Sequence, residues 1–165
     1  LLASPKDRHE QALVTEALRT ALAPVVTDLQ VPAQPEVVQL TDVQHLRTRI
    51  CGHLNGETDI FDLLQRLHPT PAVGGLPRQE ALTWLDDHEA LDRGWYAGPI
   101  GWINRSGDGE FVVAIRSALM TDSEAAAFAG CGVVMHSNPR DEWDESVVKL
   151  QTVRSGLALR GWAET

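Results

Sequence analysis

Acidic side chains stand at matching positions near the starts of two segments that the sequence predicts to be helices. Asp7 and Glu10 are three residues apart in the first segment, and Glu142 and Glu145 are three apart in the last one. Residues three apart lie on one face of a helix, so each helix directs two carboxylates along its apolar face. Carboxylates that face inward are costly to desolvate unless they are paired or bound to a cation.

A convergence of these acids would favour a hard divalent cation. Mg²⁺ is usually held by one or two carboxylates directly, while water molecules and an anionic substrate fill the other positions. The alternative is that acidic residues in a first helical turn only offset the helix dipole. Two observations weaken that alternative: Glu10 lies past the first turn, and Lys149 lies one turn after Glu145 on the same face.

Several residues further along the chain could hold an anion. Arg116 follows the apolar residues 111–115 and is expected on one face of a strand, where its guanidinium suits a carboxylate of a substrate or of one of the acids above. Gly130 and Gly132 flank Cys131 in a segment without bulky side chains. Such glycines let a ligand approach backbone N–H groups, although a plain turn is the commoner explanation.

Two other side chains are weaker candidates for a ligand contact. His45 begins the polar face of a predicted strand, where a histidine that faces solvent or is already hydrogen-bonded is the usual arrangement. Tyr96 is the only tyrosine in the chain, and an apolar anchor with its hydroxyl at the rim explains it equally well. The sequence has no Walker loop, Cys-x-x-Cys, His-Glu-x-x-His or Gly-x-Ser-x-Gly motif.

The elements that must position these residues follow from periodicity and turn residues. Helices are predicted over residues 5–26, 59–67, 78–87 and 139–159, and strands over residues 37–40, 43–54, 96–104, 110–119 and 130–135. A proline- and glycine-rich loop covers residues 68–77, and turn residues 106–109 predict a hairpin. This order predicts an α+β fold with a mostly antiparallel sheet covered by helices.

Bulk properties restrict the class of protein. The chain has 165 residues, 43% of them hydrophobic and 22% charged, which suits one globular domain or a large piece of one. A net charge of −9 argues against a nucleic-acid or anionic-membrane partner. Two well-separated cysteines and the absence of an apolar run of about 20 residues favour a cytoplasmic protein. Because a helix start follows Leu1 at once and no initiator Met precedes it, we expect part of a longer protein.

Seven segments in order along the chain resemble the chorismate-utilising enzymes. This family includes isochorismate synthases, salicylate synthases and the large subunits of anthranilate and aminodeoxychorismate synthases. The segments are residues 4–10 (SPKDRHE), 43–46 (VQHL), 67–77 (LHPTPAVGGLP), 92–102 (DRGWYAGPIGW), 113–118 (VAIRSA), 129–134 (AGCGVV) and 142–149 (EWDESVVK). The resemblance implies that residues 1–165 are the carboxyl-terminal portion of the family's chorismate-binding α/β sandwich.

The resemblance also implies a role for each matching residue. Glu10 and Glu145 match the glutamates that bind Mg²⁺, and Asp7 and Glu142 match the acids that hold the metal's water molecules. The substrate-binding positions are matched by His45 near the ring, Tyr96 and Arg116 as side-chain partners of a carboxylate, Gly130 and Gly132 as the backbone that grips it, and Lys149 beside the metal.

Ala72 discriminates among members of the family. Members that add ammonia usually carry threonine there, whereas the His-Pro-Thr-Pro-Ala sequence resembles isochorismate synthases, in which a small side chain leaves room for water as the nucleophile. The implied function is the Mg²⁺-dependent conversion of chorismate to isochorismate. A salicylate synthase, another chorismate-utilising enzyme and a non-catalytic chorismate- or metal-binding fragment remain alternatives. The pathway, whether menaquinone, phylloquinone or siderophore biosynthesis, stays open.

The family's catalytic acid and base are not matched in this chain. The general-base lysine and the general-acid glutamate of the family are expected upstream of Leu1. We therefore assign no catalytic residue here and expect these 165 residues alone to be inactive without the missing amino-terminal part. Gln11 is a mild departure, because many relatives carry histidine at that position.

Overall fold

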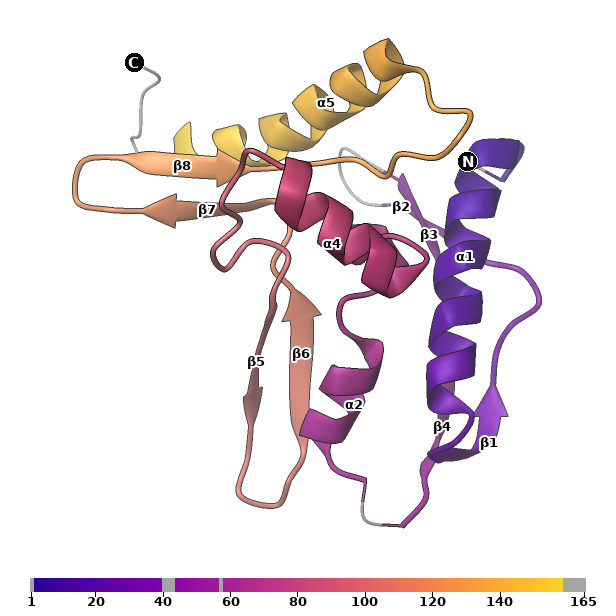
Figure 1. Ribbon diagram of the computed structural model, residues 1–165. Coiled ribbons are helices and arrows are strands. Elements are labelled where there is room, and N and C mark those ends of the chain that lie inside the picture. Colours follow the sequence, from indigo (N-terminus) through magenta and orange to yellow (C-terminus); the bar gives the residue numbers. More distant parts are fainter. Residues whose placement is uncertain (1, 40–43, 57, 159–165) are drawn as a thin grey trace. The chain divides into compact units, whose positions relative to one another are not determined.

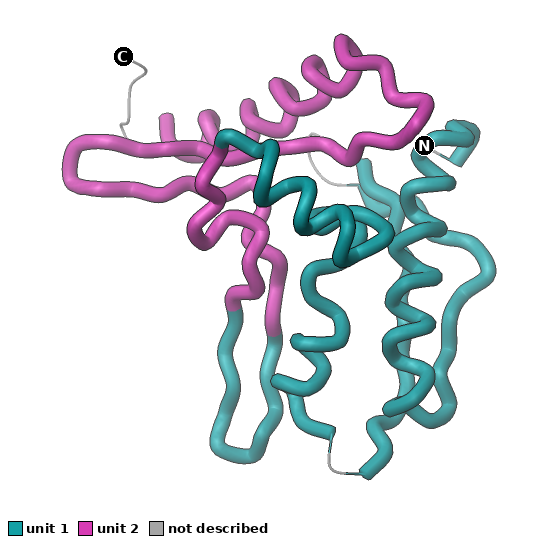
Figure 2. The backbone as a smooth tube through the Cα atoms, viewed as in Figure 1, with its two compact units in different colours: residues 1–90, 101–110 teal, residues 91–100, 111–165 magenta. Residues whose placement is uncertain are grey.

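The computed structural model describes residues 2–39, 44–56 and 58–158 as a set of helices and short strands (Figure 1). The chain divides into two compact units (Figure 2). Unit 1 comprises residues 1–90 and 101–110, and unit 2 comprises residues 91–100 and 111–165. That both units belong to one domain over residues 1–165 stays a prediction.

The first helix of unit 1, α1 (Pro5–Leu22), begins as the sequence predicts. The Ser4 side chain accepts a hydrogen bond from the Asp7 amide at 3.2 Å, and Pro5 occupies the first turn, where its missing N–H is not needed. The helix ends at Leu22 rather than at the predicted Val26, because Pro24 has no N–H with which to extend the hydrogen-bond ladder. Val26 instead begins a strand that the periodicity missed.

The strands of unit 1 form two antiparallel pairs. Strand β1 (Val26–Gln30) pairs with β4 (Cys51–Leu54), and β2 (Glu36–Gln39) pairs with β3 (Gln44–Arg47). The long strand predicted over residues 43–54 is therefore two strands, with an interruption at residues 48–50. The predicted strand over residues 37–40 is confirmed as far as Gln39, since residues 40–43 lie outside the described chain.

Three helices complete the main part of unit 1: α2 (Ile60–Leu67), α3 (Pro71–Gly74) and α4 (Arg78–His88). Helix α2 begins with a capping box, in which Asp59 and Asp62 each bond the other's backbone amide. Helix α1 contacts α2, α3 and β1. The predicted helices over residues 59–67 and 78–87 are confirmed, and the predicted loop over residues 68–77 contains the short helix α3.

The predicted hairpin is formed by β5 (Pro99–Ile103) and β6 (Gly109–Val113), which are shorter than predicted. Asn104 shapes its tip, because the side-chain carbonyl accepts hydrogen bonds from the amides of Ser106 at 2.8 Å and Asp108 at 3.0 Å. The tip belongs to unit 1. A Cβ on Gly109 would lie 2.7 Å from Cδ1 of Ile60, so the tip contacts the start of α2 closely.

Unit 2 contains the antiparallel strands β7 (Ser117–Met120) and β8 (Ala125–Phe128), with helix α5 (Pro139–Ala158) in contact with β8 (Figure 1). The prediction of a strand over residues 130–135 is wrong. The strand is the alanine run before it, which pairs with β7 although alanine favours helices, and residues 129–135 are irregular. The predicted start of the last helix is confirmed, and Leu159 lies outside the described residues.

The antiparallel pairs and the helices confirm the predicted α+β class. Among the described residues, Val25 and Ala97 are the buried apolar side chains, at 7% exposure each. In the described part of the chain, no helix is both long enough and apolar enough to cross a lipid bilayer.

Candidate functional site

The best-defined cluster of predicted site residues lies in unit 2, where α5 meets the irregular segment after β8. Lys149 Nζ lies 2.6 Å from Glu145 Oε1 and donates a hydrogen bond to the Gly130 carbonyl at 3.2 Å. Residues 145 and 149 are one helical turn apart, so the predicted common face is confirmed. The ammonium group therefore links a predicted metal ligand to the backbone predicted to grip a carboxylate.

Glu142 is the second predicted acid of α5, and it is buried. Its residue exposure is 6%, and each carboxylate oxygen exposes less than 1 Å². The Glu142 carboxylate raises the pKa of the Cys131 thiol, so it lies near the segment from Gly130 to Gly132. A buried carboxylate needs donors or a cation around it, so this position is more consistent with a site than with an offset of the helix dipole in solvent.

The environment of Cys131 reports the charge around this cluster. Burial raises the pKa of the Cys131 thiol, and the neighbouring Glu142 carboxylate raises it further. The charge of Glu145 acts in the same direction, whereas the Lys149 ammonium opposes it. The thiol therefore lies in a locally negative environment to which both predicted acids of α5 contribute.

Tyr96 reaches the same backbone. Its ring stacks on Phe128 of β8, with the ring centroids 5.4 Å apart and an interplanar angle of 21°. A Cβ on residue 130 would lie 3.2 Å from the Tyr96 hydroxyl, so glycine at this position leaves room for the hydroxyl. Tyr96, Gly130 and Lys149, which were predicted separately, thus come together within unit 2, and Gly132 follows in the same irregular segment.

Arg116 is not on a strand face as predicted. Strand β6 ends at Val113, and the Ala114 amide and carbonyl bond the backbone of residues 98 and 97, which closes the ladder there. The chain then bends before β7, and Arg116 takes a φ of 50° in this bend. A positive φ is uncommon for a residue other than glycine and marks a constrained position. Its role as partner of a substrate carboxylate stays a prediction.

Unit 1 holds the other pair of predicted acids on α1. Lys6 Nζ lies 3.4 Å from Glu10 Oε1, an oxygen that exposes less than 1 Å². Asp7 lies one turn before Glu10 and is partly buried. Gln11 Nε2 donates to Thr48 Oγ1 at 2.9 Å, which fastens this end of α1 to the chain that follows β3. Gln11 therefore has a structural hydrogen bond.

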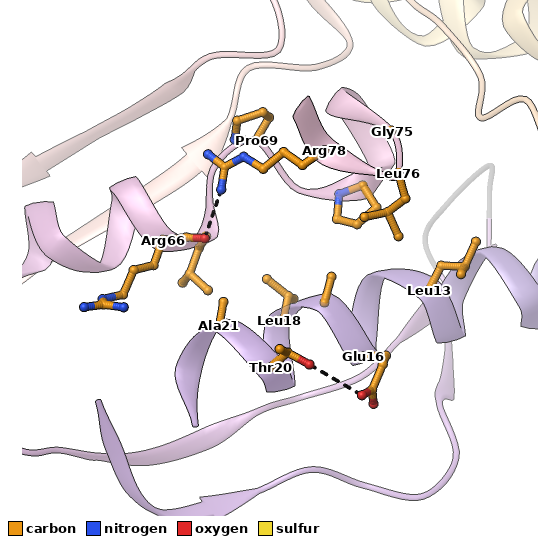
Figure 3. Close-up of a pocket in the computed structure, with 13 residues that line it drawn as sticks. Leu13, Glu16, Leu18, Thr20, Ala21, Arg66, Pro69, Gly75, Leu76 and Arg78 are labelled. Atoms are coloured by element: carbon orange, nitrogen blue, oxygen red, sulfur yellow. Dashed lines mark hydrogen bonds between the residues drawn. The ribbon is translucent and has the colours of Figure 1, made fainter. Parts of the chain in front are cut away.

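The two remaining predicted residues are also in unit 1. His45 lies in β3, where it pairs with Val38 of β2. Ala72 lies in α3 and is exposed. Neither residue lines the hollow of ≈ 360 Å³ between α1 and the segment from α2 to α4, whose walls include Leu13, Ala17, Leu67 and Pro71 (Figure 3). This hollow is therefore separate from the predicted ligand contacts.

The predicted metal ligands are divided between the two units. Within residues 2–39, 44–56 and 58–158, no group of three or more His, Cys, Asp or Glu side chains is placed to hold a metal ion. Each unit supplies two predicted acids, one pair on α1 and one pair on α5. Whether Glu10 and Glu145 share one Mg²⁺ stays a prediction. The desolvated oxygens of Glu10 and Glu142 are hard donors of the kind that Mg²⁺ takes.

Sequence reasoning missed two contacts near these residues. The proximity of Cys131 and Glu142 joins residues that are not close in sequence, and no local pattern predicts it. Arg78 was assigned only to the start of a helix, yet its guanidinium binds backbone carbonyls at the end of α2. A basic residue shortly after a helix end and a proline-rich loop was the available signal, because the last carbonyls of a helix attract cations.

Comparison with known proteins gives a consistent result. The family described as chorismate binding enzymes matches residues 1–158. The salicylate biosynthesis isochorismate synthase of Pseudomonas aeruginosa is 50% identical over 161 residues, which are 98% of this chain and 34% of that protein. The isochorismate synthase MenF of Bacillus subtilis is 42% identical over 157 residues, which are 95% of this chain and 33% of that protein.

A solved structure shows the same fold. The structure described as a putative 2,3-dihydroxybenzoate-specific isochorismate synthase, DhbC, from Bacillus anthracis superposes with a TM-score of 0.91 at 42% identity. The match covers 96% of this chain and 43% of that chain, so the 165 residues span between a third and a half of the length of these relatives. The family predicted from the sequence motifs is confirmed, and the chain belongs to the chorismate binding enzymes.

Proposed function

We propose that the protein carrying this chain is an isochorismate synthase, which converts chorismate to isochorismate with the help of Mg²⁺. In this proposal the chain supplies the half of the site that binds the metal and the substrate carboxylate. The observation that carries the proposal is the cluster in unit 2, where Lys149, Tyr96 and Gly130 meet next to the buried Glu142. The 50% identity to a protein named as an isochorismate synthase supports the choice of reaction.

The cluster has the chemistry of a carboxylate-binding site. Lys149 brings a positive charge to the Gly130 carbonyl, and the Tyr96 hydroxyl lies over the same glycine. An ammonium, a hydroxyl and nearby backbone N–H groups can each donate to a carboxylate, and bonds to an ionised acceptor are the stronger ones. Chorismate carries two carboxylates, so such donors would hold one of them and orient the ring for reaction.

Mg²⁺, when bound, would supply positive charge to the substrate carboxylate and so fix the ring in place. Glu10 and Glu145 are the proposed direct ligands, and Asp7 and Glu142 would hold the metal's water molecules. The Lys6 and Lys149 ammonium groups lie 3.4 Å and 2.6 Å from Glu10 and Glu145, so a cation bound there would share these carboxylates with a lysine.

The choice of nucleophile rests on Ala72. A methyl side chain leaves room for water beside the attacked carbon, as expected for an enzyme that moves a hydroxyl from one ring position to another. His45 would face the ring. The family's general-base lysine and general-acid glutamate are not matched in this chain. We therefore assign no proton transfer to its residues. A salicylate synthase, which also eliminates pyruvate, is the second candidate, because the motifs of this chain resemble those of salicylate synthases as well.

The test is to incubate the full natural protein with chorismate and Mg²⁺ and to separate the products by chromatography. We expect isochorismate. Salicylate with pyruvate would favour the second candidate, and the absence of any product would contradict both enzyme proposals. Removal of divalent cations with a chelator should abolish turnover, and added Mg²⁺ should restore it.

A matched pair of variants on α5 tests the role of the acids. Glu145→Gln should lower activity by about 100-fold or more, since loss even of an outer partner of a metal costs 10–100-fold. Asp144→Asn is the control, because Asp144 is exposed on the same helix and pairs with Arg140 at 3.5 Å. The control should stay within about twofold of the wild type. Equal losses in the two variants would contradict the assignment of Glu145.

A further inference from the structure

The loop between α2 and α4, residues 68–77, is held in one conformation by close packing. Gly74 is buried, and a Cβ there would lie 2.8 Å from Cγ of Pro69. Gly75 has a φ of +77°, and a Cβ there would lie 2.7 Å from the Cβ of Ala81 in α4. Side chains larger than hydrogen do not fit at either position, so the backbone of the loop is tightly defined around Ala72.

The ends of this loop have few side-chain bonds of their own. Thr70 precedes α3 and Pro77 precedes α4, and neither caps its helix with a side-chain hydrogen bond. The last carbonyls of α2 also lack partners within that helix. Backbone hydrogen bonds from the amides of residues 73–75 to the carbonyls of Thr70 and Pro71, together with the packing of the two glycines, hold the middle of the loop, and its ends depend on bonds from outside.

Arg78 supplies such a bond from the far end of the loop. Its Nη1 donates to the Arg66 carbonyl at 3.3 Å (Figure 3). Its Nη2 donates to the carbonyls of Gln65, at 3.4 Å, and of His68. Arg78 is the first residue of α4 and directly follows the loop, so these bonds join the end of the loop to the carbonyls at its start. A planar cation at a helix carboxyl terminus suits both the geometry and the dipole.

The state of His68 agrees with this arrangement. Burial lowers the pKa of His68, and the positive charge of Arg78 lowers it further. The guanidinium therefore lies close enough to the start of the loop for its charge to act on the His68 imidazole.

We propose that Arg78 is a positioning residue for the reaction, which holds the loop of residues 68–77 so that Ala72 keeps its place beside the attacked carbon. This inference rests on the proposed function. Arg78 acts through the backbone of the loop and does not touch the substrate. Its loss should therefore leave carboxylate binding in unit 2 intact and impair the step that depends on Ala72.

The test compares three variants of the full natural protein. Arg78→Ala removes the bonds to the carbonyls. Arg78→Lys keeps the charge but not the planar fork. Arg66→Ala is the matched control, because it removes a guanidinium from the wall of the same hollow and leaves the Arg66 backbone carbonyl in place. Amide hydrogen exchange of residues 69–76 and steady-state kinetics with chorismate are measured for each.

We expect Arg78→Ala to speed exchange in residues 69–76 by about tenfold, which corresponds to the loss of a charged hydrogen bond. Exchange in β7 and β8 should not change. kcat should fall by about tenfold while KM changes by less than about twofold, because carboxylate binding is retained. Arg78→Lys should recover part of both losses, and Arg66→Ala should match the wild type.

Either of two results would overturn the inference: exchange in Arg78→Ala equal to that in Arg66→Ala, or faster exchange with unchanged kcat. Where Arg78→Ala does not fold, the comparison of Arg78→Lys with Arg66→Ala decides by the same criteria. If the wild type does not convert chorismate, the proposed function is wrong, and the exchange measurement still decides whether Arg78 holds the loop.

Discussion

Replacing Lys149 with methionine should loosen α5 from the segment that follows β8. Lys149 is 26% exposed, pairs with Glu145 at 2.6 Å and donates to the Gly130 carbonyl at 3.2 Å. Because Glu145 is 43% exposed, solvent screens the pair, and we assign it about 0.5 kcal/mol. The charged hydrogen bond to the carbonyl adds about 1.5 kcal/mol. The free energy of unfolding should therefore fall by about 2 kcal/mol.

Urea denaturation, followed by circular dichroism at low salt and in about 1 M NaCl, measures this loss and divides it. High salt screens the ion pair but leaves the bond to the carbonyl, so the difference between wild type and Lys149→Met should shrink to about 1.5 kcal/mol in high salt. A difference that disappears in high salt would mean that the ion pair alone carries the effect.

Arg140→Met is the matched control on the same helix. Arg140 Nε lies 3.5 Å from Asp144 Oδ2 with the same four-residue spacing, but its side chain is 82% exposed, and its described contacts stay within α5. This substitution should cost no more than a few tenths of a kcal/mol. If both substitutions cost the same, the bond to Gly130 does not stabilise the fold and the reasoning is refuted.

Three further changes have defined outcomes. Ser4→Ala removes the cap of the Asp7 amide and should lower the free energy of unfolding in urea by about 1 kcal/mol, whereas Ser4→Asp should preserve it. The Glu142 carboxylate raises the pKa of the Cys131 thiol, so Glu142→Gln should lower that pKa and increase the thiolate fraction between pH 7 and 9. Alkylation of Cys131 in metal-free buffer, followed by mass spectrometry, should therefore be faster in the variant. An unchanged rate of alkylation would contradict this reasoning. Gly130→Ala places a Cβ 3.2 Å from the Tyr96 hydroxyl and should raise KM for chorismate severalfold while the stability stays nearly constant. An unchanged KM would argue against binding of the substrate carboxylate by the backbone at residue 130.

Local sequence signals predicted the starts of elements better than their ends. Ser4 with Pro5 marks the start of α1, and the side-chain bond that defines the cap is observed. The end of α1 and the strand β1 were missed, because the apolar spacing around Val26 fits a helix as well as a strand. The alanine run of β8 shows the same limit, since its pairing with β7 overrides the preference of alanine for helices.

The candidate site was predictable where it depends on helical geometry. The spacing of Glu145 and Lys149 placed them on one face of α5, and the ion pair between them is observed. The place of Arg116 was not predictable from alternation, because a bend with a positive φ precedes the next strand. Contacts such as those of Arg78 join parts of the chain that only the folded loop brings together, so no periodicity reveals them.

The hairpin of β5 and β6 sets a constraint on biogenesis. Its tip, residues 101–110, belongs to unit 1, whereas residues 91–100 belong to unit 2. A ribosome that delivers the chain from its amino terminus exposes Ile60 well before Gly109 can cover it, and it begins unit 2 before unit 1 has received its last piece. Domains normally mature one after another during translation. Here unit 1 cannot be completed before residues 91–100 of unit 2 have been synthesised, and a nascent chain that stalls after residue 90 has a complete α2 whose first residue Gly109 does not cover.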